Sequence, residues 1–197
     1  RRANPGDDFL STLILAEDQG SKLTNLEMCA LVGAVLGAGS DTAVDLHSYL
    51  IKNLLQHPEE FESLKSDPGL VQGAISETLR YESSGKTGLA RYASEDLEIN
   101  GNHVKKGQMV QLITSTAGMD SSIYNDPRKF DIQRDHDKSI SFGQGPHYCI
   151  GVTLVRSQTE VMLKELFKRF PNLSLGDEIV YDYNQCYKVP VQNCRYY

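Results

Sequence analysis

The stretch from Thr24 to His57 carries helical hydrophobic periodicity and contains no proline. Thr24 and Glu27 have the spacing of a capping box, in which each side chain bonds the other residue's backbone amide. Pro58 follows at once and favours the first turn of a new helix. About 34 residues at 1.5 Å rise per residue give a rod of about 50 Å. A helix of that length crosses a whole domain, so the rest of the chain must be arranged around it.

Elsewhere the pattern alternates between helical and extended segments. The Asn100-Gly101 pair is a strong signal for a β-hairpin turn. Periodicity predicts further helices at about 9–14, 59–66, 70–81 and 149–169, strands at 89–93, 97–99 and 109–114, and irregular chain over 120–141. We therefore expect a mixed α+β fold that is mainly α, with small sheets.

Composition excludes several classes of function. The chain has 197 residues, 40% of them hydrophobic, and a net charge of −6, which disfavours a nucleic-acid surface. Its four cysteines, at 29, 149, 186 and 194, are irregularly spaced and match neither a disulfide framework nor a zinc site. We see no signal peptide and no apolar stretch long enough to span a bilayer. These features favour a reduced, cytoplasmic protein without a membrane anchor.

Two glycines interrupt the long helix in the segment Gly37-Ala38-Gly39-Ser40-Asp41-Thr42. Each costs about 1 kcal/mol relative to alanine in a helix interior, so some gain should offset it. Thr42 can bond back to the carbonyl of Ala38 and open a groove, with Asp41 beside it as a titratable acid. Close packing of another helix on the glycines explains the same residues, and the segment alone favours that alternative.

Glu77 and Arg80 stand three residues apart on a predicted helix, so their charges can pair. Such pairs are common on solvated faces, where they contribute less than about 1 kcal/mol. Taken alone, this pair indicates nothing about function.

The segment from Ser141 to Gly151 reads Ser-Phe-Gly-Gln-Gly-Pro-His-Tyr-Cys-Ile-Gly. Its glycines permit tight backbone turns, and Cys149 falls at the predicted start of the last long helix. A cysteine at a helix N-terminus is biased towards the thiolate. A buried free cysteine in a loop is the simpler alternative, but it leaves the glycines and Phe142 unexplained.

Taken together, the segments resemble the cytochrome P-450 superfamily of haem-thiolate monooxygenases. The resemblance rests on Phe-x-x-Gly-x-x-x-Cys-x-Gly ending at Gly151, preceded in order by Ala-Gly-x-Asp-Thr at 38–42 and Glu-x-x-Arg at 77–80. It covers the whole chain but only the C-terminal part of that fold. It implies that residues 1–197 are the C-terminal part of one domain whose N-terminal part is absent, which an intact-mass measurement would test.

The resemblance assigns a haem b cofactor with Cys149 as the protein ligand to iron. Hydrogen bonds from the glycine-rich turn would tune the thiolate, and the turn would let the loop approach the porphyrin closely. Phe142, Gly143 and Gly151 would shape this proximal loop. Arg91 and His147 would hold the haem propionates. Ser139 stands where many bacterial members have histidine, and it would bind a propionate more weakly.

On the distal side, the resemblance makes Ala38 and Gly39 the groove over the iron. Asp41 and Thr42 would be the catalytic residues that deliver protons there. Glu77, Arg80 and Arg134 would form a buried ion triad that serves folding and haem retention. Substrate would contact the residues Ala34, Ala38, Lys86, Thr87, Leu89, Gln185 and Cys186.

The function implied is insertion of one oxygen atom from O2 into a small organic substrate, by hydroxylation or epoxidation. The sequence between the motifs is most similar to that of soluble bacterial members that tailor polyketides. Electrons would come from a ferredoxin and its reductase. Two alternatives stay open: a peroxide-driven haem oxidase, and a truncated haem-binding chain without catalytic activity.

Overall fold

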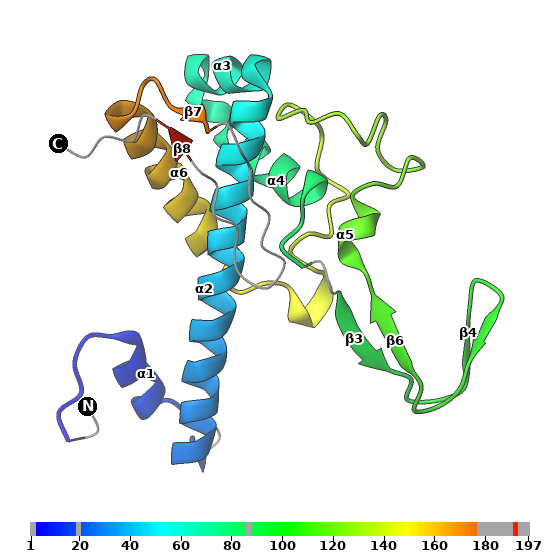
Figure 1. Cartoon of the computed structure of the whole chain (residues 1–197). Coiled ribbons are helices and arrows are strands. Elements are labelled where there is room, and N and C mark those ends of the chain that lie inside the picture. The colour runs from blue at the N-terminus through cyan, green and yellow to red at the C-terminus, as the bar shows by residue number, and fades with distance from the viewer. Residues whose placement is uncertain (1–2, 19–20, 86–87, 177–190, 193–197) are drawn as a thin grey trace. The chain divides into compact units, whose positions relative to one another are not determined.

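The computed structural model describes residues 3–18, 21–85, 88–176 and 191–192, with no account of the side chains of 17, 18, 21, 191 and 192. The chain divides into two compact units, residues 1–42 and residues 43–197. Figure 1 labels the elements.

The first unit begins with helix α1 (Phe9–Leu15), followed by the paired two-residue strands β1 (Glu17–Asp18) and β2 (Ser21–Lys22). Asp8 caps α1 because its Oδ1 accepts the Ser11 amide at 2.8 Å. Helix α2 (Asn25–Gln56) starts in this unit and continues into the second. It is the long helix that the sequence predicts.

The predicted capping box at the start of α2 is confirmed. The Thr24 amide donates to Glu27 Oε2 at 2.9 Å, and the Glu27 amide donates to Thr24 Oγ1 at 3.2 Å. Each side chain therefore satisfies a backbone donor that the first turn would leave without a partner. At the other end, the helix stops at Gln56, just before Pro58, as predicted.

One expectation about α2 needs correction. By length and composition alone, this helix could cross a membrane, with a mean hydropathy of 1.3 over its best window. The core helix of a soluble protein passes the same test. In the second unit this helix does contribute to the core, since Leu46, Leu50 and Leu54 are at most 2% exposed.

The core of the second unit is helical. Helices α3 (Pro58–Ser66), α4 (Val71–Tyr81) and α6 (Val152–Arg169) surround the C-terminal part of α2, with the 3-10 turn η1 (Pro68–Leu70) between α3 and α4 (Figure 1). Their apolar faces meet in one cluster that includes Leu50, Ile75 and Leu163. His47 of α2 also contacts Thr159 of α6, Nε2 to Oγ1 at 3.0 Å. Burial of this shared apolar surface is the main stabilising contribution.

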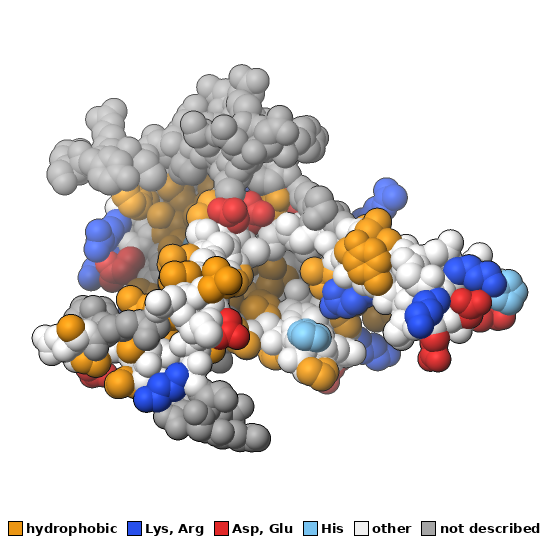
Figure 2. Space-filling model, turned by 90° about the horizontal axis from the view of Figure 1, so that it is seen from below, with side chains coloured by type: hydrophobic (Ala, Val, Ile, Leu, Met, Phe, Trp, Pro, Cys, Tyr) orange, Lys and Arg blue, Asp and Glu red, His pale blue; other side chains and the backbone are white. Residues whose placement is uncertain are grey.

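Two antiparallel strand pairs extend from this core. Strand β3 (Leu89–Tyr92) pairs with β6 (Met109–Leu112), and β4 (Leu97–Ile99) pairs with β5 (Asn102–Val104). The predicted hairpin turn is confirmed, because Asn100 and Gly101 both have positive φ, 49° and 78°. Figure 2 shows acidic, basic and histidine side chains gathered at the hairpin end of the molecule.

The remaining elements are short. Helix α5 (Thr114–Ala117) takes up residue 114, so the predicted strand over 109–114 ends two residues early, at Leu112. The 3-10 turn η2 (Gly145–His147) lies in the cysteine segment, and β7 (Ser174–Leu175) pairs with β8 (Val191–Gln192). Residues 120–141 contain neither helix nor strand, as predicted.

The start of the last long helix was predicted wrongly. Helix α6 begins at Val152 with Gly151 as its N-cap, not at Cys149. The turn η2 and the positive φ values of Gly143 and Gly145 keep the preceding chain out of helical geometry. Cys149 therefore lies before the helix and not, as the sequence predicts, at its first turn.

Candidate proximal cofactor site

Glu77 and Arg80 form a buried ion pair on α4. Arg80 Nε donates to Glu77 Oε2 at 2.6 Å, and Arg80 Nη2 donates to Glu77 Oε1 at 2.7 Å. Both side chains are 0% exposed. Their spacing places them on one face of the helix, and that face is turned inward. The solvated-face alternative is therefore wrong.

Arg80 also binds three backbone carbonyls, those of Gly118 at 2.6 Å, Pro127 at 2.7 Å and Lys129 at 3.1 Å. These bonds tie the irregular segment to α4 and use the planar fork of the guanidinium. Gly118 is required for the close approach, because an added Cβ would lie 2.2 Å from the Arg80 carbonyl oxygen.

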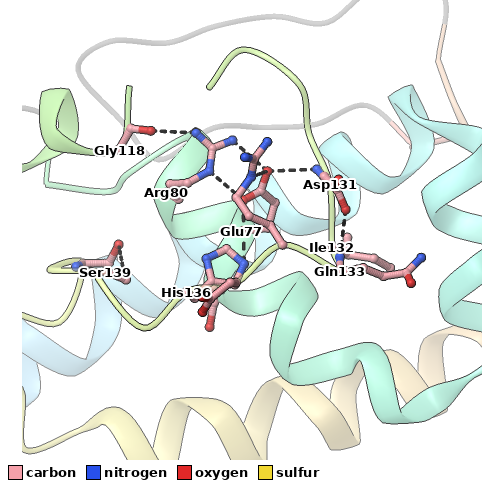
Figure 3. Close-up of polar contacts among 12 residues, drawn as sticks. Glu77, Arg80, Gly118, Asp131, Ile132, Gln133, His136 and Ser139 are labelled. Atoms are coloured by element: carbon pink, nitrogen blue, oxygen red, sulfur yellow. Dashed lines mark hydrogen bonds and ion pairs between the residues drawn. The ribbon is translucent and has the colours of Figure 1, made fainter. Parts of the chain in front are cut away.

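Arg134 approaches Glu77 from the irregular segment, Nε to Oε1 at 3.4 Å. The Asp131 amide donates to the same oxygen at 2.9 Å. Figure 3 shows Arg80 and the Asp131 amide pointing toward the Glu77 carboxylate. The structure thus brings together the three residues of the expected triad, and every oxygen of Glu77 has a charged or amide partner.

His136 belongs to this cluster and was missed by the sequence analysis. Its Nε2 lies 3.7 Å from Glu77 Oε2, and its side chain is 12% exposed (Figure 3). Neither ring nitrogen has a hydrogen-bond partner among the described residues. Burial lowers the pKa of His136, and the nearby cations Arg80 and Arg134 lower it further against the opposing effect of Glu77. No local pattern marks this residue, since it lies within the irregular segment.

The cysteine loop is shaped by glycine. Gly143 has φ 78° and Gly145 has φ 69°, a region that other residues adopt at a cost. The Cys149 amide donates to the Phe142 carbonyl at 2.9 Å, and the Tyr148 amide donates to Gly145 at 3.0 Å. The loop thereby closes on itself and presents Cys149 as an exposed, free thiol.

The residues present fit a haem held by a thiolate. The thiol of Cys149 is exposed and forms no disulfide, so its sulfur can serve as an axial ligand. Gly151 stands beside it, and an added Cβ there would lie 3.8 Å from Sγ. Glycine therefore keeps the space next to the sulfur open. Phe142 is half-buried and packs its ring against the helical core, which anchors the loop.

The other expected site residues form few contacts with the cysteine loop. Ser139 Oγ donates to Ser141 Oγ at 3.1 Å, and His147 lies exposed in η2. Leu89 and Arg91 lie exposed on β3, where Arg91 Nη1 donates to the Ala90 carbonyl. Among the described residues, no hydrogen bond or ion pair joins Arg91 to the cysteine loop. Lys86, Thr87, Gln185 and Cys186 lie outside the described residues.

The acid and alcohol of α2 belong to the first unit. Thr42 Oγ1 donates to the Ala38 carbonyl at 2.6 Å, which is the predicted back-bond. Ser40 Oγ lies 3.4 Å from Asp41 Oδ1. Within the described structure, an added Cβ at Gly37 or Gly39 meets no atom within 4 Å. No helix packs on these glycines there, and Ala34 on the same helix is likewise exposed.

The loop turned by Gly143 and Gly145 presents the free thiol of Cys149 next to a helical core, an arrangement that could hold a haem through a thiolate. The family model described as cytochrome P450 matches residues 69–180, which include the ion cluster and the cysteine loop. The chain belongs to the cytochrome P450 family.

Relatives agree with this assignment. The chain is 40% identical over 189 residues to an epothilone C/D epoxidase from Sorangium cellulosum, covering 95% of this chain and 45% of the relative. It is 37% identical over 185 residues to a 6-deoxyerythronolide B hydroxylase from Saccharopolyspora erythraea, covering 92% and 46%. The solved structure of epothilone B-bound cytochrome P450epoK superposes with a TM-score of 0.89 at 39% identity, covering 97% of this chain and 48% of that chain. The chain thus spans about half the length of the curated relatives it matches.

Proposed function

We propose that the protein is a haem-thiolate monooxygenase that inserts one atom of O2 into a small organic substrate by hydroxylation or epoxidation. The observation that carries this proposal is the exposed, free thiol of Cys149 in a loop closed by the hydrogen bond between its amide and the Phe142 carbonyl. Membership of the family implies a haem-iron cofactor, and we assign it as haem b. When bound, that group would supply oxygen activation.

On the proximal side, Cys149 would bind the iron as thiolate and Phe142 would pack beside the macrocycle. Arg91, His147 and Ser139 would hold the propionates through charge-assisted or neutral hydrogen bonds. The exposed positions of Arg91 and His147 leave their side chains able to reach such a group. Gly143 and Gly151 would keep the backbone close to the cofactor.

On the distal side, Ala38 and Gly39 would form the groove. The Thr42 hydroxyl donates to Ala38 in the structure, so its oxygen lone pairs can accept a further hydrogen bond. Asp41 stands next to it and would resupply the proton that Thr42 passes on. Substrate would contact Ala34, Ala38, Lys86, Thr87, Leu89, Gln185 and Cys186.

We assign the substrate to secondary metabolites of polyketide type, because a further relative, from Bacillus subtilis and 37% identical over 176 residues, is named for polyketide biosynthesis. A ferredoxin and its reductase would deliver electrons, and the protein would act in the cytoplasm. Turnover with a ferredoxin system but not with hydrogen peroxide would distinguish this function from a peroxide-driven oxidase.

The carbon monoxide difference spectrum of the reduced, haem-loaded protein tests the assignment. The wild type should show the absorbance of a thiolate-bound ferrous haem, and Cys149→Ala should lose it. Cys29→Ala is the matched control, because Cys29 is also a free, exposed cysteine and lies outside the loop. Retention of the thiolate spectrum in Cys149→Ala would contradict the proposal.

A further inference from the structure

Arg156 joins α6 to α4 close to the cysteine loop. Its Nη1 donates to Gln72 Oε1 at 2.8 Å, and its Nη2 donates to Ser76 Oγ at 3.2 Å. Both acceptors are neutral. Among the described residues no carboxylate forms an ion pair with Arg156, although Asp137 lines the same cavity of about 330 Å³. The guanidinium is therefore fixed in direction while its charge is not neutralised by direct contact.

The same guanidinium lies over the ring of Phe142, with Cζ 5.5 Å from the ring centroid. That distance is within the range of a cation–π interaction. The Phe142 carbonyl in turn accepts the Cys149 amide at 2.9 Å. A continuous series of contacts thus leads from α4 through Arg156 and Phe142 to Cys149.

The contrast with Arg80 shows why the charge of Arg156 can act on the loop. Arg80 is paired with a carboxylate in a fully buried cluster, so its field is largely cancelled. Arg156 is half-buried and held by an amide and a hydroxyl, so water screens it only partly. A positive charge near a thiolate stabilises the anion and reduces its donation to a bound metal.

We propose that Arg156 is a positioning residue that fixes the ring of Phe142, whose carbonyl accepts the Cys149 amide, and, through its charge, raises the reduction potential of the haem. This inference rests on the proposed haem-thiolate function. It adds a residue outside the cysteine loop to the groups that set electron uptake.

A redox titration of the haem-loaded protein tests the inference. Arg156→Gln removes the charge but keeps hydrogen-bonding groups, and Arg156→Lys keeps the charge. At a fixed potential, Arg156→Gln should lower the ratio of reduced to oxidised haem by about tenfold, which corresponds to about 59 mV for one electron. Arg156→Lys should stay near the wild type. Arg169→Met is the control, because it removes a charge from the exposed end of the same helix.

A double-mutant cycle tests the route through the ring. If Arg156 acts through Phe142, the shift caused by Arg156→Gln should shrink at least twofold in a Phe142→Leu background. An equal shift in both backgrounds would overturn the positioning role. Should Arg156→Gln fail to hold haem, Arg156→Met serves as the second neutral variant in the same cycle.

The two proposals fail in different ways. A wild type without the thiolate signature in its carbon monoxide spectrum contradicts the proposed function. The inference alone is contradicted by a different result. In that case the wild type and the neutral Arg156 variants all show the thiolate signature, and their haem reduction potentials differ by no more than those of Arg169→Met and the wild type.

Discussion

The carboxylate of Glu77 accepts hydrogen bonds from two guanidinium nitrogens of Arg80, at 2.6 and 2.7 Å, and neither side chain is exposed to solvent. The pair does more than cancel charge. Through Arg80 it binds the carbonyl of Gly118 and two carbonyls of the irregular segment, and through Glu77 it binds the Asp131 amide and Arg134. A loop without regular secondary structure is thereby fixed to the helix that lies behind the cysteine loop.

Arg80→Leu should destabilise the fold by about 3–5 kcal/mol, because it leaves the Glu77 carboxylate buried without its main partner. Urea unfolding measured by circular dichroism gives the free energy. Arg169→Ala is the control, since Arg169 pairs with Glu165 on an exposed face and should contribute less than about 1 kcal/mol. Equal losses in the two variants would contradict the special role of the buried pair.

Gly73→Ala should be destabilising by about 3 kcal/mol or more, because an added Cβ would lie 2.1 Å from the Ile132 carbonyl oxygen. That oxygen is backbone and cannot move without shifting the loop. Gly33→Ala is the matched control in α2, where an added Cβ meets no atom within 4 Å. It should raise stability by up to about 1 kcal/mol through helix propensity. Thermal unfolding of the two variants would separate these outcomes.

Stability should fall as the pH drops below about 6.5, in part because of His136. Burial and the neighbouring Arg80 and Arg134 lower its pKa in the folded state, so the unfolded chain binds the proton more readily. Above about pH 6.5 His136 is neutral and adds no pH dependence to the free energy of unfolding. Below that pH the loss of stability accumulates as the pH falls towards the lowered pKa of the folded state. Burial lowers the pKa of His47 as well, with the same sign.

His136→Gln should therefore flatten the pH dependence of unfolding below pH 6.5, and His47→Gln should flatten it further in the double variant. Urea unfolding at several pH values measures this slope. A slope in His136→Gln as steep as that of the wild type would rule out the contribution assigned to His136.

Thr42→Ala should reduce product formation by about 10²-fold, because it removes the hydroxyl that is expected to pass protons on the distal side. Reductant should still be consumed, with hydrogen peroxide released in place of product. Thr42→Ser keeps a hydroxyl that can donate to the Ala38 carbonyl, as Thr42 does at 2.6 Å, and should stay close to wild type. Product, peroxide and consumed reductant measured in one assay test the prediction, and product formation that accounts for all of the reductant in Thr42→Ala would refute it.

Local features of this protein were predictable from sequence because the groups involved are neighbours along the chain. The capping box of Thr24 and Glu27, the Asn100-Gly101 turn and the glycine-turned cysteine loop each depend on residues a few positions apart. The order of three short motifs was sufficient to indicate the family. The pattern could not place the start of α6, since helical periodicity continues past the turn that keeps Cys149 out of the helix.

Tertiary structure decided which of these local features are buried and what they contact. A Glu and an Arg three residues apart give the same sequence pattern on a solvated helix face as in a core. Only the packing of the helices buries the side chains of Glu77 and Arg80. Arg134 lies 57 positions after Glu77 in the irregular segment, so its register could not be derived from periodicity. The contact of Arg156 with Phe142 likewise depends on how α6 packs against α4. Local sequence sets backbone conformation, whereas burial and long-range contacts follow from the way apolar faces come together.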